Sequence, residues 1–252
     1  MRALRASPVF ALLLLVTLGL FGLLGVVLMQ GEVIGTHSHF REHHHRVHDL
    51  TFAFLFGAAG VGLLAQLLSP SKNVAGQLMA LIPWLGLALV FPLTEYWSAR
   101  GAGFVIVATA LFGALTLNAA IFHPSGRDLL RSFNASRVDR LMLALVAIAA
   151  VPLLAFASTS IGLQRTAADD HADLGHYGFM AAFSFTLIGV GVLSSLRPDG
   201  WRLTAWVAGL LPALLGLASI VFPDVTSSLS VVWALAAISW AVVFVAAAEL
   251  RR

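Results

Sequence analysis

Six of the nine histidines lie in one short segment, GTHSHFREHHHRVHDL, which covers residues 35–50. Neutral imidazole is a ligand for zinc, copper(II), nickel and iron, and imidazole also titrates near neutral pH. The other three histidines are His123, His171 and His176. The chain has no cysteine, which excludes thiolate metal sites, iron–sulfur clusters, disulfides and cysteine nucleophiles.

The elements that must position these histidines are apolar. Of the 252 residues, 59% are hydrophobic and 11% are charged, whereas soluble domains carry about 25% charged residues. Blocks of about 20 uncharged residues match the length of a helix that crosses a bilayer. We therefore predict an all-α integral membrane protein with eight transmembrane helices, in contact with lipid and not with nucleic acid. The expected spans are 8–30, 49–68, 74–92, 102–122, 140–159, 177–196, 203–222 and 228–248.

The basic residues predict the orientation of the chain, because cytoplasmic loops are enriched in Arg and Lys. With the N-terminus inside, eleven of the fifteen basic residues lie on the inner side, and Arg41, Arg46, Arg100 and Arg165 lie outside. This count predicts an inner-membrane protein with both termini in the cytoplasm and the histidine-rich segment outside.

Residues of the first half recur in the second half at an offset of 128 to 131 positions. Such a recurrence predicts two tandem four-helix repeats, 1–122 and 140–252, joined by a basic cytoplasmic linker, 123–139. Because each repeat has an even number of spans, a pseudo-two-fold axis along the membrane normal would relate them. The matched pairs are His43 with His171, His48 with His176, Gly60 with Gly189, Gly62 with Gly191, Pro70 with Pro198, Pro83 with Pro212, and Phe91–Pro92 with Phe222–Pro223.

The repeat selects a candidate metal site on the outer side. If the second and sixth spans face the axis, His48 and His176 approach each other there, and one acid per half follows the third span of that half. The five-residue spacing inside each histidine pair is looser than one helix face, so the pair needs a non-helical turn to share one ion. The predicted ligands are His43, His48, His171, His176, Glu95 and Asp224.

Some of these residues also have structural interpretations. His37, His39, His44 and His45 have no counterpart in the second half, and we expect them to belong to a solvated loop. Acids near helix starts, among them Asp49, Asp170 and Asp173, suit helix capping as well as they suit metal ligation. Tyr96 and Trp97 are typical of interfacial anchors.

The interior of the spans carries no charged residue, which argues against an ion-coupled carrier with an acidic site at mid-membrane. Small residues at 56–62 and 188–195 favour close packing between the two halves. Phenylalanines beside the paired histidines leave a b-type haem open as an alternative cofactor.

Three functions remain open from the residues alone. The first is a membrane protein with an extracytoplasmic His/carboxylate site for zinc, copper, nickel or iron, which serves metal binding, sensing, delivery or a metal-dependent step. The second is a cofactor-free accessory subunit that packs beside partner subunits of a membrane complex. The third is a redox protein that binds haem b.

Overall fold

The computed structural model describes residues 7–34, 43–98, 102–126, 132–134 and 137–250. It is helical, with no strand among these residues. Within these residues, eight helices are long and apolar enough to cross a membrane, which is the number of helices that the sequence predicts. They are α2 (Pro8–Ile34), α3 (Arg46–Leu68), α4 (Val74–Thr94), α5 (Ala102–Ile121), α7 (Arg140–Thr166), α9 (His176–Leu196), α10 (Trp201–Val221) and α11 (Val231–Leu250).

Among the described residues, four short helices lie in the connections between these spans. They are η2 (His43–His45), η3 (Pro70–Lys72), η4 (Tyr96–Ser98) and α8 (Asp170–Leu174). The fifth span, α7, continues to Thr166, beyond its expected end at residue 159. No proline lies between residue 159 and Thr166, and the single glycine there, Gly162, is tolerated inside a helix.

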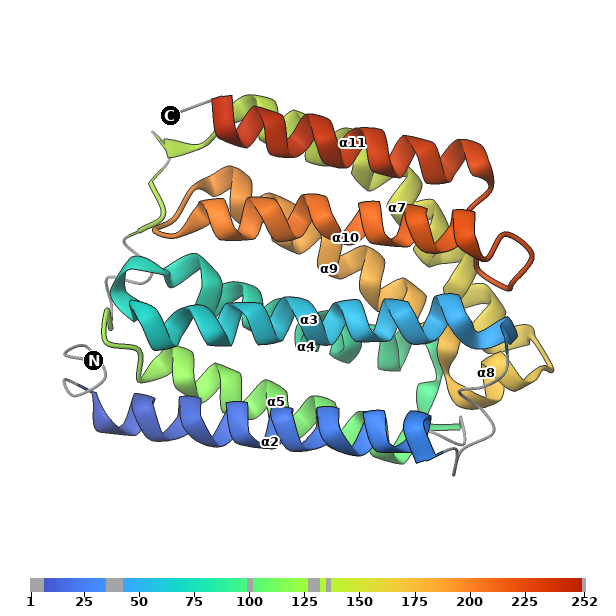
Figure 1. Cartoon of the computed structure of the whole chain (residues 1–252), viewed down its shortest axis with the longest axis horizontal. Helices are drawn as coiled ribbons and strands as arrows, with labels where there is room; N and C mark the ends of the chain where they lie inside the picture. The colour runs from blue at the N-terminus through green and yellow to red at the C-terminus, as the bar shows by residue number, and fades with distance from the viewer. Residues whose placement is uncertain (1–6, 35–42, 99–101, 127–131, 135–136, 251–252) are drawn as a thin grey trace.

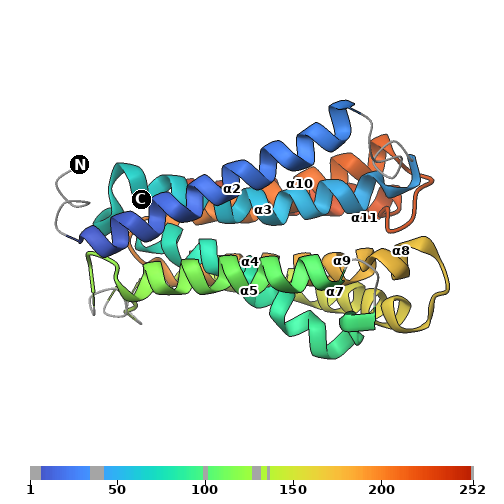
Figure 2. The same ribbon diagram turned by 90° about the horizontal axis from the view of Figure 1, so that it is seen from below.

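The eight spans form two layers (Figures 1 and 2). One layer contains α2, α3, α10 and α11, and the other contains α5, α4, α9 and α7. The central helices α3, α4, α9 and α10 all contact one another. The same neighbours occur in each half of the chain: the first span packs on the second and fourth, and the third packs on the second and fourth.

Burial follows this arrangement. The inner helices α4, α9 and α10 have most of their residues buried, whereas α2, α5, α7 and α11 leave most of theirs on the surface. Exposed apolar residues such as Leu12, Val107, Val151 and Val232 lie on these outer helices. An apolar exterior of this kind is stable only in lipid or detergent, as expected for a multi-pass membrane protein.

Small residues permit close helix packing, but only in part between the two halves. Gly62 of α3 packs on Gly76 and Ala80 of α4, within the first half. Gly191 likewise packs on Val146 of α7, within the second half. Gly189 packs on Ile82 of α4 and so joins the halves. The expectation that these stretches pack mainly between halves is therefore wrong for Gly62 and Gly191, because each faces the neighbouring span of its own half.

The packing at Gly62 makes a prediction about stability. A Cβ at this position would lie 2.3 Å from the carbonyl oxygen of Gly76, so Gly62→Ala forces α3 and α4 apart. We expect a loss of about 1–3 kcal/mol, measured as a lower thermal midpoint in detergent. Gly57→Ala is the matched control on the same helix, because a Cβ there meets no atom within 4 Å. A Gly62→Ala midpoint equal to that of Gly57→Ala would contradict the packing described here.

Candidate metal centre

The start of α3 presents histidines on one face. The 3-10 turn η2 (His43–His45) runs directly into α3 at Arg46. His45 and His48 are three residues apart across this junction, a spacing that places two helical side chains on the same face. Both are fully buried, whereas His44 is exposed.

The second pair of histidines lies on either side of a glycine turn. Asp169 caps the short helix α8, where its carboxylate accepts a hydrogen bond from the Ala172 N–H at 2.9 Å. The chain then reverses at Gly175, whose φ of +79° is left-handed, and α9 begins at His176. Glycine is favoured at this position, because it adopts the left-handed conformation without the steric cost of a Cβ atom. This turn is the non-helical element that the spacing of His171 and His176 requires.

Two buried side chains hold this turn in place. Gln164 of α7 donates to the Ala172 carbonyl at 2.7 Å and accepts from the Gly178 N–H at 3.1 Å. Tyr96 lies against Gly175, so that a Cβ on this glycine would be 2.2 Å from the tyrosine hydroxyl. Tyr96 is 1% exposed, so the expectation of an interfacial anchor is wrong for this residue. It packs inward because it follows the left-handed end of α4 at Glu95.

The histidines of the two turns form one cluster at the end of the bundle where α3 and α9 begin. The imidazole rings of His48 and His176 are stacked with centroids 5.1 Å apart. The ring of His171 is 4.8 Å from that of His48 and 4.5 Å from that of His45. His45 Nδ1 and His176 Nδ1 are 3.1 Å apart, so one of these nitrogens donates to the other. The predicted approach of His48 and His176 therefore occurs, through contact between α3 and α9.

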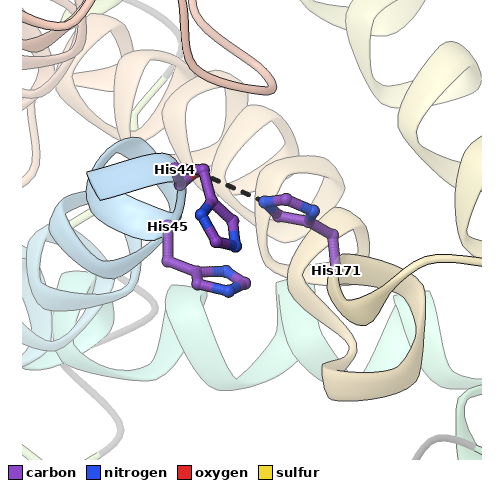
Figure 3. A group of neighbouring side chains, drawn as sticks. All are labelled: His44, His45 and His171. Atoms are coloured by element: carbon purple, nitrogen blue, oxygen red, sulfur yellow. Dashed lines mark hydrogen bonds between the residues drawn. The ribbon is translucent and has the colours of Figure 1, made fainter. Parts of the chain in front are cut away.

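Within the described residues, two groups of three histidines have ligand atoms close enough to hold an ion. The inner group is His48, His171 and His176, all of which are buried. The outer group is His44, His45 and His171, of which His44 is exposed (Figure 3). In each group, one nitrogen from each residue lies within 4.8 Å of the others. The two groups share His171.

Hydrogen bonds orient the rings from outside the cluster. His48 Nε2 is 2.9 Å from the hydroxyl of Ser227, in the turn between α10 and α11. His171 Nε2 donates to the main-chain carbonyl oxygen of His44 at 3.3 Å (Figure 3). His48 Nδ1 is buried and has no hydrogen-bond partner within the described part of the chain. Hydrogen bonds such as those of His48 with Ser227 and of His171 with the His44 carbonyl fix the tautomer and direction of metal-ligating histidines.

One carboxylate lies close to the cluster without belonging to either group. Asp169 accepts from the Tyr177 hydroxyl at 2.8 Å. Burial alone would raise the pKa of Asp169, but hydrogen bonds from the Ala172 N–H and the Tyr177 hydroxyl, together with His171, lower it. Asp169 therefore stays ionised beside the imidazoles and adds negative charge that favours a nearby cation.

The structure brings together three of the six predicted ligands, namely His48, His171 and His176. The side chain of His43 lies outside the described part of the structure, as do His37 and His39. Glu95 and Asp224 lie outside both groups. Glu95 accepts from Arg165 at 3.4 Å on the surface, and Asp224 is exposed in the turn after α10.

The expectation of a solvated loop is wrong for His45, which is fully buried in the cluster. The local signal was its three-residue spacing from His48 at the start of a helix. No sequence signal pointed to Ser227, which is 179 positions from His48. None pointed to Gln164 either, because its contacts with Ala172 and Gly178 depend on how α7 packs against α9.

His123 is separate from this cluster. Its Nε2 donates to Gln66 Oε1 at 3.2 Å and its Nδ1 accepts from the Ser125 N–H at 3.2 Å, so both nitrogens are satisfied. Burial lowers the pKa of His123 to about 4, against a smaller raising effect of the Pro70 main chain. It is a neutral structural histidine at the end of α5.

Comparisons with protein-family models, with curated proteins and with solved structures found no match to this chain. The class of protein is therefore defined by the fold and the histidine cluster alone. It is a multi-pass helical membrane protein with buried histidines close enough to hold a metal ion.

Proposed function

We propose that this protein binds one transition-metal ion through His48, His171 and His176. The observation that carries the proposal is the inner group: three buried imidazoles, one each from α3, α8 and α9, with ligand atoms within 4.8 Å of one another. Burying three polar rings together is unfavourable unless their nitrogens find partners. A metal ion would serve as the shared partner, most directly for His48 Nδ1.

The donor set indicates the kind of metal. Three imidazole nitrogens without thiolate suit zinc, copper, nickel or iron better than calcium or magnesium, which prefer oxygen. Three protein ligands leave a fourth position open, as in sites that act on a bound species and unlike closed structural sites. The site therefore fits sensing, delivery or a metal-dependent step, in which another molecule completes the coordination.

The outer hydrogen bonds support the same proposal. The Nε2–H of His171 is held by a carbonyl and Nε2 of His48 by a serine hydroxyl. Each bond leaves the other nitrogen of its ring for the ion, which is the usual arrangement around metal-ligating histidines.

The topology is part of the proposal. The matching helix neighbours in the two halves support tandem four-helix repeats, 1–122 and 140–252, related by a pseudo-two-fold between α3 and α9. The excess of Arg and Lys in the loops at the opposite end supports an orientation in the cytoplasmic membrane with the histidine cluster outside.

A cofactor-free accessory subunit is the second candidate function. Its support is the hydrogen bonding inside the cluster, such as the contact between His45 and His176, which could serve packing alone. Haem b has less support, because the rings of His48 and His176 stack on each other, whereas two axial ligands must point at an iron from opposite faces of a macrocycle.

The test is metal analysis of tag-free protein purified in detergent without chelator, followed by titration with Co²⁺ as a probe. We expect about one ion per chain, and a loss of at least about 100-fold in affinity in the double variant His48→Ala/His176→Ala. The double variant His37→Ala/His39→Ala removes the same number of imidazoles and should bind normally. Protein that is purified without metal and does not bind Co²⁺ would contradict the proposal and favour the function of an accessory subunit.

A further inference from the structure

The outer histidine group contains the one exposed histidine of the two groups. His44 is exposed, His45 is fully buried, and His171 is 6% exposed. Every member of the inner group is buried. Of the five histidines in the two groups, His44 is therefore the one most accessible to an ion in solvent.

The two groups cannot both use His171 while its ring is neutral. A carbonyl oxygen only accepts hydrogen bonds, so the 3.3 Å contact with His44 places the ring hydrogen on His171 Nε2 (Figure 3). A neutral imidazole has one nitrogen with a free lone pair. One ion at a time can hold that nitrogen, so occupancy of the outer group and of the inner group excludes each other.

The rings form a continuous path between the two groups. The centroids of His44 and His45 are 4.1 Å apart, and His45 Nδ1 is 3.1 Å from His176 Nδ1. His171 contacts both His45 and His48. An ion can thus change ligands along this path without leaving nitrogen donors.

We propose that His44, His45 and His171 form a loading position that passes one metal ion to the inner group. This inference rests on the proposed function. Bonds from the ion to His44 and His45 break as bonds to His48 and His176 form, and the ion keeps or re-forms its bond to His171. The exchange changes neither the oxidation state of the ion nor the total charge.

The test is stopped-flow binding of Co²⁺ to the full chain in detergent, with equilibrium titration in parallel. In His44→Ala we expect association and dissociation to slow by the same factor, about tenfold or more, because a removed intermediate raises the barrier in both directions. Affinity and a stoichiometry of one ion should stay as in the unmodified protein. His44 is exposed, and His44→Ala keeps the main-chain carbonyl that accepts from His171. His39→Ala, in the preceding segment, is the control and should bind at the normal rate.

Three results would overturn the loading position. They are an unchanged rate in His44→Ala, an equal slowing in His39→Ala, and two ions in the unmodified protein with one in His44→Ala, which would indicate a bridged pair of ions. Failure of the proposed function gives a different result: the unmodified protein binds no ion, or His48→Ala binds the ion with the same affinity as the unmodified protein.

Discussion

His171→Ala is expected to abolish stoichiometric metal binding with a single substitution. His171 belongs to both histidine groups, so its loss leaves two imidazoles in each. Removal of one of three protein ligands should weaken binding by at least about 100-fold, since even second-layer changes cost 10- to 100-fold. The measurement is Co²⁺ titration, read from the visible absorption of the bound ion.

Asp170→Ala is the matched control for His171→Ala. Asp170 lies beside His171 on the same short helix, but it is exposed and belongs to neither group. We expect normal metal binding in this variant and a free energy of unfolding within about 0.5 kcal/mol of the unmodified protein, as for most surface substitutions. If Asp170→Ala lost the ion as His171→Ala does, the cause would be damage to α8 and not the loss of a ligand.

Gly175→Ala is expected to have the largest effect on stability. Alanine at a φ of +79° costs about 1–2 kcal/mol. Its Cβ would also lie 2.2 Å from the hydroxyl oxygen and 2.5 Å from a ring carbon of the buried Tyr96, which forces the turn between α8 and α9 to move. We expect a total loss of roughly 3 kcal/mol or more. Metal binding should fall as well, because the turn sets His171 against His176.

Gly126→Ala separates the two causes. Gly126 also has a positive φ, at +49°, but a Cβ there meets no atom within 4 Å. This variant should lose only about 1 kcal/mol and bind metal normally. Thermal midpoints in detergent and Co²⁺ titrations on both variants decide the matter. Equal losses in the two variants would mean that the Tyr96 contact does not constrain the turn.

The eight spans were determined by the sequence itself. Helix length and apolarity are local properties, and the bilayer requires every backbone N–H and C=O to be satisfied within its own segment. Ala102–Ile121 and Val231–Leu250 could therefore be found from composition alone, to within a few residues at each end, whereas α7 extends seven residues beyond its expected end. The convergence of His48 and His176 could also be predicted, because each precedes the second span of its half.

The composition of the cluster was decided by the tertiary structure. His45 joins it because the 3-10 turn continues into α3 and rotates this side chain into the bundle. Glu95 is itself the left-handed residue that ends α4. The chain buries the next residue, Tyr96, and the Glu95 carboxylate pairs with Arg165 at the surface instead of joining the cluster. Ser227 reaches His48 across 179 positions of sequence. Such contacts depend on which helices are neighbours and on how each is rotated, and side-chain packing between helices sets both.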